Sequence, residues 1–217
     1  TDRLDAKSLA KYGYERGDQL GLFQASSQNQ IELFQLVQRR HDLKIILVAE
    51  KNRLQSPANN IVKDSIKAII TIIEEQLIII TKQIHVLIDA DPILKNKQAI
   101  LKTIPGIGDI VSFELLILLP ELGTLSRRQI ASLAGVAPIA QESGKFHGYR
   151  RTRHGRYGVK PILFLAAMAA RNSSKGDFKN FYEKLTIVKG KKKMVALTAL
   201  MRKIIVIANA KLKDIDA

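Results

Sequence analysis

The sequence predicts an all-α protein, in which a long antiparallel coiled-coil hairpin precedes a compact helical domain with a helix-hairpin-helix element. Apolar residues recur at helical spacing along most of the 217 residues. The segments 28–56 and 60–90 contain neither glycine nor proline, so each is predicted to be one helix. Nothing in the pattern supports a strand-rich core.

The N-terminal residues 1–25 are set apart from the long helices by their composition. Asp2 and Asp5 stand three residues apart, and on a helix this spacing places both carboxylates on one face. Hard cations such as Mg²⁺ bind oxygen ligands of this kind, usually together with further carboxylates. Acidic residues in a first turn also simply favour the helix dipole, and this alternative stays open. The glycines between Tyr12 and Gln30 predict a connection.

Residues 26–92 are predicted to form the coiled-coil hairpin. In its second helix the apolar residues step alternately by four and three, as in a coiled-coil seam of about three heptads. These are Ile66, Ile70, Ile73, Leu77, Ile80, Ile84 and Leu87. Further isoleucines widen the stripe, at Ile69, Ile72, Ile78, Ile79 and Ile88. Because a narrow hairpin leaves apolar surface exposed, we expect it to dimerise, unless it packs on its own globular domain.

The helix-hairpin-helix element is predicted over residues 93–119, where two short helices flank Ile104-Pro105-Gly106-Ile107-Gly108. Gly106 and Gly108 would let the backbone turn tightly and bring N–H groups to a phosphate oxygen, at the positive start of the next helix. Asp109 stands where such motifs usually carry a basic residue, so a pure packing role explains the turn equally well.

The remaining helices are predicted from apolar spacing and end signals. Ser126 can cap a helix that runs to Leu133, and Pro161 stands at the first position of a buried, alanine-rich helix that ends at Arg171. Short and long amphipathic helices are expected over 178–185 and 194–213. Residues 141–160, between these helices, are predicted to be a basic loop.

The charge of the chain is concentrated in its last third. The net charge is +15, yet residues 1–140 hold 17 Lys/Arg against 15 Asp/Glu, whereas residues 141–217 hold 18 against 5. Such a basic field attracts polyanions through counterion release, and the interleaved glycines and aromatic residues favour nucleic acid over a merely solubilising surface. The predicted nucleic-acid contacts are Gly106, Gly108, Gly144, Lys145, His147, Arg150, Arg151, Arg153, His154, Arg156, Lys160, Lys191, Lys192 and Lys193.

Several classes of protein are disfavoured. The chain has no cysteine, so it has neither a disulfide framework nor a thiolate metal site, and it shows no apolar run near 20 residues and no signal peptide. We therefore expect a cytoplasmic protein with no membrane partner.

Ser143 is the candidate nucleophile. It stands before Gly144 in a loop rich in arginine and histidine. A serine must be deprotonated and aimed before it reacts, and nearby cations would stabilise charge on a phosphate under attack, so the setting suits phosphoryl transfer better than acyl transfer. No Gly-x-Ser-x-Gly elbow surrounds it. The alternative is a loop serine among residues that only bind phosphate.

The order of these pieces resembles the IS110/IS1111 transposases and the related Piv-type DNA invertases, over most of the chain. The segments that carry the resemblance are Thr1–Ala6, Ile104–Gly108, Leu133–Pro138, Ser143-Gly144 with Gly148 and Gly155, Phe181–Leu185 and Met201–Ile205. Two positions depart from the family pattern: Thr152 stands where a second serine is usual, and Arg153 where lysine is common.

The resemblance implies a domain order and a function. Residues 1–25 would be the end of a RuvC-like DEDD nuclease domain with a linker, 26–92 the coiled coil, and 93–217 the serine-containing C-terminal transposase domain. The protein would be a recombinase that cuts and rejoins DNA, guided by a bridge RNA. Ser143 would be its nucleophile, and Asp2 and Asp5 would hold Mg²⁺ with two further acidic residues. The site would be assembled between the protomers of a homodimer or homotetramer. Because those residues are not in this chain, we expect the 217-residue piece to be inactive alone. The alternative is a non-catalytic helical module that dimerises and binds nucleic acid.

Overall fold

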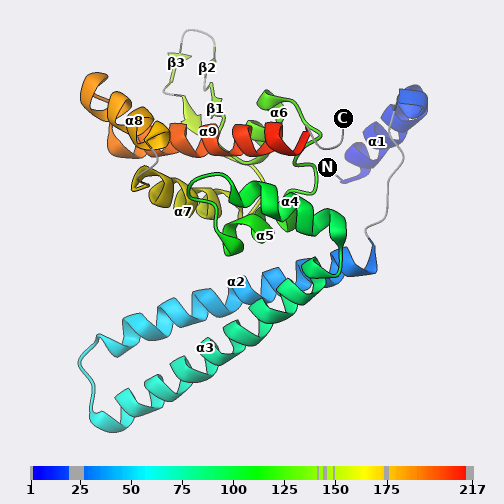
Figure 1. The fold of residues 1–217 in the computed structure, drawn as a ribbon. Helices are drawn as coiled ribbons and strands as arrows, with labels where there is room; N and C mark the ends of the chain where they lie inside the picture. Colours follow the sequence, from blue (N-terminus) through cyan, green and yellow to red (C-terminus); the bar gives the residue numbers. More distant parts are fainter. Residues whose placement is uncertain are drawn as a thin grey trace.

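The computed structural model describes residues 2–19, 27–140, 142–143, 146–148, 150–173 and 176–213, and for residues 19, 142, 143, 146 and 147 it describes the backbone alone. Most of these residues are helical, as predicted (Figure 1). The elements are α1 (Asp2–Arg16), η1 (Gly17–Gln19), α2 (Gln28–Leu54), α3 (Asn60–Asp89), α4 (Pro92–Lys102), α5 (Asp109–Leu118), α6 (Arg127–Leu133), β1 (Pro138–Ile139), β2 (Glu142–Ser143), β3 (Phe146–His147), β4 (Arg151–Thr152), α7 (Val159–Arg171), α8 (Asp177–Glu183), η2 (Lys184–Val188) and α9 (Lys193–Lys213).

Helices α2 and α3 form a long antiparallel pair, which we call the arm (Figure 1). Each helix begins at a side-chain cap: Ser27 forms a reciprocal capping box with Gln30, and the Asn59 side chain accepts from the Val62 amide. The predicted seam of α3 faces α2. Its residues Ile70, Ile73 and Leu77 form a buried cluster with Leu43 and Leu47 of α2. The pairing of two long helices is therefore confirmed.

The isoleucines that widen the stripe on α3 lie mostly outside this seam. Ile88 is buried in the main core, but Ile69, Ile72, Ile78 and Ile79 are exposed. Within this chain the arm therefore uses one apolar face, and it leaves a second one on its surface.

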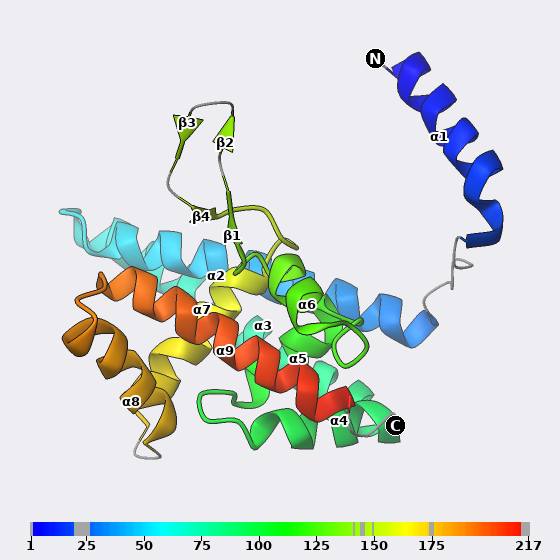
Figure 2. The same ribbon diagram turned by 90° about the horizontal axis from the view of Figure 1, so that it is seen from above.

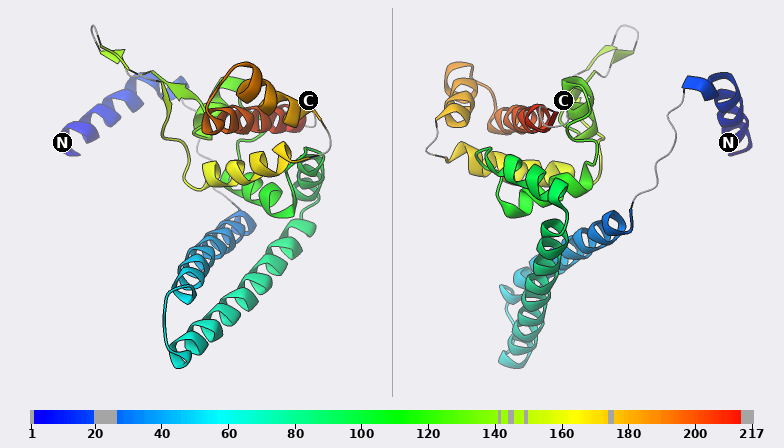
Figure 3. Two further views of the ribbon diagram at one scale, coloured as in Figure 1. Left: turned by 90° about the vertical axis from the view of Figure 1, so that its left-hand side faces the viewer. Right: turned by 45° about the vertical axis from the view of Figure 1, so that its right-hand side comes forward.

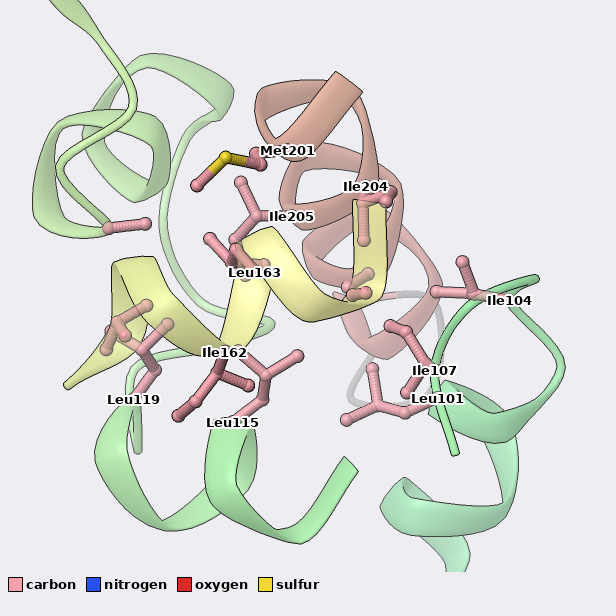
Figure 4. Packing of buried hydrophobic residues seen from close by; sticks show 14 of the residues in the cluster. Leu101, Ile104, Ile107, Leu115, Leu119, Ile162, Leu163, Met201, Ile204 and Ile205 are labelled. Atoms are coloured by element: carbon pink, nitrogen blue, oxygen red, sulfur yellow. The ribbon is translucent and has the colours of Figure 1, made fainter. Parts of the chain in front are cut away.

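Helices α4, α6, α7 and α8 pack against α9 in the domain that follows the arm, and α5 packs on α4 and α7 (Figure 4). Leu200, Ile204 and Ile205 of α9 are fully buried, as is Leu163 of α7. One polar side chain is also buried here: Asn209 accepts from the Gly123 amide at 3.0 Å and donates to the Leu125 oxygen at 2.8 Å. These bonds fix the α5–α6 connection to α9, because an unpaired buried amide would be costly.

Three local features differ from the prediction. Helix α1 continues to Arg16, into the segment predicted as a connection, and within the described residues it contacts only η1 (Figure 2). Helix α7 begins at Val159, so Pro161 is its third residue, where its missing N–H is still without cost. The basic loop contains the two-residue strands β2, β3 and β4, and β1 lies just before it; such strands are too short to leave an alternating pattern in the sequence.

None of the helices in the described part of the chain is long and apolar enough to cross a bilayer.

Candidate active site and nucleic-acid interface

Ser143 lies on a small β structure, residues 138–152, which we call the serine hairpin. Its strands pair antiparallel in two places: β1 with β4, through Pro138↔Thr152 and Ile139↔Arg151, and β2 with β3, through Glu142↔His147 and Ser143↔Phe146. The hairpin projects from the helices (Figures 2 and 3). Gly144 and Lys145 lie outside the described residues, as do the side chains of Ser143 and His147. The structure thus places the backbone of the candidate nucleophile on a projecting element.

The base of the serine hairpin is fixed where two backbone segments cross. Gly135 and Gly155 both have positive φ, +69° and +94°. A Cβ atom on Gly135 would overlap the backbone oxygen of His154, and one on Gly155 would overlap the backbone of Gly135. The Arg156 amide donates to the Leu133 oxygen at 2.7 Å. Only glycine permits this crossing, since both the backbone conformation and the space exclude a side chain.

Arg156 holds the hairpin base to the end of α5. Its guanidinium donates to both carboxylate oxygens of Glu121, at 2.6 and 2.5 Å, and to the Leu118 oxygen at 2.9 Å. The hydrogen bond from Arg156 lowers the pKa of Glu121, which keeps that carboxylate charged. A bidentate pair of this kind fixes orientation as well as position. Arg156 was predicted to contact nucleic acid; both terminal nitrogens of its guanidinium form hydrogen bonds inside the protein, and the contact itself stays a prediction.

Lys160 also has partners within the chain: its Nζ atom donates to the Thr152 oxygen at 3.1 Å and to the hydroxyl at 3.2 Å. Arg150, Arg151, Arg153 and His154 are exposed along the hairpin and its base, and Lys191, Lys192 and Lys193 are exposed at the start of α9. The predicted basic contacts therefore divide into two that fasten the hairpin and a larger set that faces solvent.

The turn between α4 and α5 has a packing role at Gly106. Its φ is +90°, and a Cβ there would overlap the Ala166 oxygen and lie 2.8 Å from the Ala170 Cβ atom on α7. Gly108 has open space around the position of a Cβ atom, so packing does not explain this glycine. Lys102 pairs with Asp109 at 2.5 Å, and this hydrogen bond lowers the pKa of Asp109. The negative charge of Asp109, at the start of α5, is thus balanced by Lys102.

Asp2 and Asp5 both lie in the first turn of α1 and are exposed, as their spacing predicts. The described residues contain no group of three or more His, Cys, Asp or Glu that could hold a metal ion. Two carboxylates have the right chemistry for Mg²⁺ but are an incomplete set of ligands. Because α1 contacts only η1, the structure does not bring Asp2 and Asp5 to the serine hairpin within this chain.

The sequence reasoning missed a buried polar cluster that joins the arm to the domain. Arg40 of α2, only 5% exposed, donates to Glu114 of α5 at 2.6 Å and to the hydroxyl of Thr81 at 3.2 Å. Burial raises the pKa of Glu114 despite this pair. Next to it, His41 meets the ring of Tyr157 edge to face, 5.9 Å between centroids. A signal existed, since Arg40 occupies a seam position among apolar residues of α2.

Comparisons with known proteins agree on one class. Residues 98–183 match the family described as Transposase IS116/IS110/IS902, and this range includes the whole serine hairpin. The pilin gene-inverting protein of Moraxella bovis is 30% identical over 218 aligned residues, and so is that of Moraxella lacunata. The alignment covers 99% of this chain, and the chain spans 66% of the length of each of these relatives.

Proposed function

The chain belongs to the IS116/IS110/IS902 transposase family and is homologous to the pilin gene-inverting proteins over nearly its whole length, and from this premise we propose that it acts in a DNA recombinase with Ser143 as the nucleophile. The observation that carries the proposal is the serine hairpin. It is a projecting element inside the matched range, with Ser143 on β2 and exposed arginines along β4.

The proposed step transfers a phosphoryl group from DNA to the protein. The Ser143 oxygen loses its proton and attacks the phosphorus of a phosphodiester, an O–P bond to serine forms, and the bond to the leaving deoxyribose oxygen breaks as that oxygen takes up a proton. Rejoining is the reverse, with the hydroxyl of another DNA end as the attacking group. Exposed guanidinium groups such as those of Arg151 and Arg153 would stabilise the charge that develops on the phosphate oxygens.

We propose in addition that Asp2 and Asp5 are two ligands of a Mg²⁺ site that acidic residues outside this chain complete. Support comes from the incomplete ligand set on α1 and from the separation of α1 from the domain that carries Ser143. On this view the 217 residues alone do not recombine DNA.

The arm is the proposed site of self-association. Ile69, Ile72, Ile79 and Val86 are exposed on α3 at steps of three and seven, which places them on one stripe outside the seam with α2. A second copy of the arm would cover this stripe and form a homodimer or homotetramer, which would also let α1 of one protomer reach the serine hairpin of another. The partners are then DNA and a guide RNA of the bridge type, both of which the net charge of +15 would attract.

The test is Ser143→Ala in the full-length protein, with Ser132→Ala on the exposed side of α6 as the matched control. The protein is incubated with DNA that carries the two ends of the transposable segment. Covalent protein–DNA adducts are then detected in denaturing gels, and DNA affinity is measured in parallel. We expect Ser143→Ala to bind DNA like the wild type but to form no adduct, whereas Ser132→Ala forms adducts normally. Adducts in the Ser143→Ala protein would refute the assignment of the nucleophile.

A non-catalytic nucleic-acid-binding module is the second candidate. It is favoured by one observation, namely that Asp2 and Asp5 are not gathered with Ser143. In that case neither the wild type nor the variants would form adducts, although all would bind DNA.

A further inference from the structure

The connection between α8 and α9 carries four exposed aliphatic side chains close together in sequence. Ile187 and Val188, at the end of η2, are 77% and 76% exposed, and Met194 and Val195, in the first turn of α9, are 59% and 54% exposed. We call residues 184–195 the lysine–aliphatic turn. Single exposed aliphatic residues are ordinary, but four in one turn form a patch of the kind that marks a contact surface.

Lysines surround this patch. Lys184, Lys189, Lys191, Lys192 and Lys193 are all exposed, and between residues 184 and 213 the sequence has nine Lys or Arg and no Asp or Glu. Neighbouring like charges repel, so a fully basic turn is most favourable when a polyanion neutralises it. The charge therefore selects an anionic partner for the aliphatic patch.

The backbone holds the turn in a defined shape. Helix α8 continues into η2, a single π-helical turn, which the bond from the Lys189 amide to the Lys184 oxygen closes at 3.1 Å. The Lys191 amide then donates to the Leu185 oxygen at 2.9 Å, and Gly190 has a φ of +58°. Isolated π-helical turns are rare and frequently occur at functional sites.

The position of the turn relates it to the proposed nucleophile. In Figures 1 and 3 the serine hairpin and the orange segment that links α8 to α9 both lie on the side of the domain that faces away from the arm. One ligand could therefore touch both elements.

We propose that the lysine–aliphatic turn binds duplex DNA, with its lysines on the phosphates and with Ile187 and Val188 wedged into a base step that becomes kinked. Aliphatic wedges of this size, flanked by basic residues, are a recurrent means of bending DNA. The bend would direct the duplex toward the serine hairpin. The inference rests on the proposed function, since it assumes that DNA is the substrate.

The wedge is tested with the full-length protein and a mixed-sequence duplex of about 30 base pairs that carries a fluorophore at each end. Energy transfer between the dyes reports bending. Wild-type protein should raise the transfer, and Ile187→Ser with Val188→Ser should remove most of that rise while the dependence of affinity on salt is unchanged. The control is Ile78→Ser, an isoleucine on α3 that is 69% exposed, which should bend DNA like the wild type.

The lysines are tested through the salt dependence of binding. Lys191→Gln with Lys192→Gln should reduce the slope of log affinity against log salt by about 2, because each phosphate contact contributes about 0.9. Lys82→Gln, on the exposed surface of the arm, should leave the slope unchanged.

Three results would overturn the proposal. They are wild-type bending by the Ile187→Ser and Val188→Ser protein, an unchanged slope in the lysine variant, and lysine-dependent binding to phosphatidylglycerol vesicles without DNA bending. The proposed function is judged separately. Adducts that depend on Ser143 would support the proposed function even if Ile187 and Val188 do not bend DNA. A protein that binds no DNA in any form would refute both the proposed function and the DNA-bending proposal.

Discussion

At the scale of single residues, glycine and arginine have roles here that composition does not reveal. The sequence predicted that Arg156, Lys160 and Gly106 would contact nucleic acid, and the structure shows in addition that all three make close contacts within the protein. Spacing along the chain cannot distinguish a basic residue that faces solvent from one that has met a carboxylate far away in sequence. Glu121 is 35 residues from Arg156, and nothing local connects them.

The crossing of Gly135 and Gly155 gives a residue-scale prediction. Gly135→Ala adds a Cβ that overlaps the His154 oxygen, at a φ that alanine rarely adopts. We expect a loss of about 3 kcal/mol in the free energy of unfolding, measured by urea denaturation. Gly108→Ala is the control, because its Cβ meets open space and its φ is negative, and it should cost less than about 1 kcal/mol. Equal losses in the two variants would contradict the steric account.

At the scale of elements, the helices were predictable and the strands were not. The alternating steps of four and three in α3 identified the face that packs on α2, and Ser126 was predicted as the cap of α6. These signals repeat or are local, so one sequence suffices to detect them. The two-residue strands of the serine hairpin depend instead on a glycine crossing and on an arginine pair with distant residues. The spacing of Asp2 and Asp5, which predicted that both lie on one face of a helix, is also a local signal.

The seam of the arm gives a prediction at the scale of elements. Ile73→Ala removes a buried side chain between α2 and α3 and should lower the free energy of unfolding by about 2–4 kcal/mol. Ile78→Ala, on the same helix, removes the same atoms from a side chain that is 69% exposed and should cost less than about 1 kcal/mol. Circular dichroism during denaturation measures both. A similar cost for the two would mean that the arm uses another face in solution.

At the scale of the whole molecule, the sequence predicted a basic helical protein with an arm, but it could not predict how its parts combine into a site. The excess charge, the arm and the serine segment were all visible in the sequence. How these parts are placed relative to one another depends on the buried Arg40–Glu114 pair, which joins the arm to the domain. Among the described residues, helix α1 contacts neither the arm nor the domain. Such relations join residues far apart in sequence.

Self-association is the prediction that belongs to this scale. Ile72→Glu with Ile79→Glu places charges in the middle of the exposed stripe on α3 and should convert a dimer or tetramer to monomers, as measured by analytical ultracentrifugation. Ile78→Glu is the matched control, since its side chain is exposed on α3 but does not belong to the row of Ile69, Ile72, Ile79 and Val86. A monomeric wild type, or an unchanged mass in the double variant, would exclude this stripe as the interface.

The buried pair between Arg40 and Glu114 also constrains how this protein can diverge. Loss of either partner leaves the other charge buried without compensation, which costs about 3–5 kcal/mol, whereas joint replacement by apolar residues of similar volume is often neutral. Evolution from the charged pair to an apolar pair therefore cannot readily proceed through single substitutions, because each intermediate is destabilised. Positions 40 and 114 should therefore covary among homologous proteins, because they form the contact between the arm and the domain.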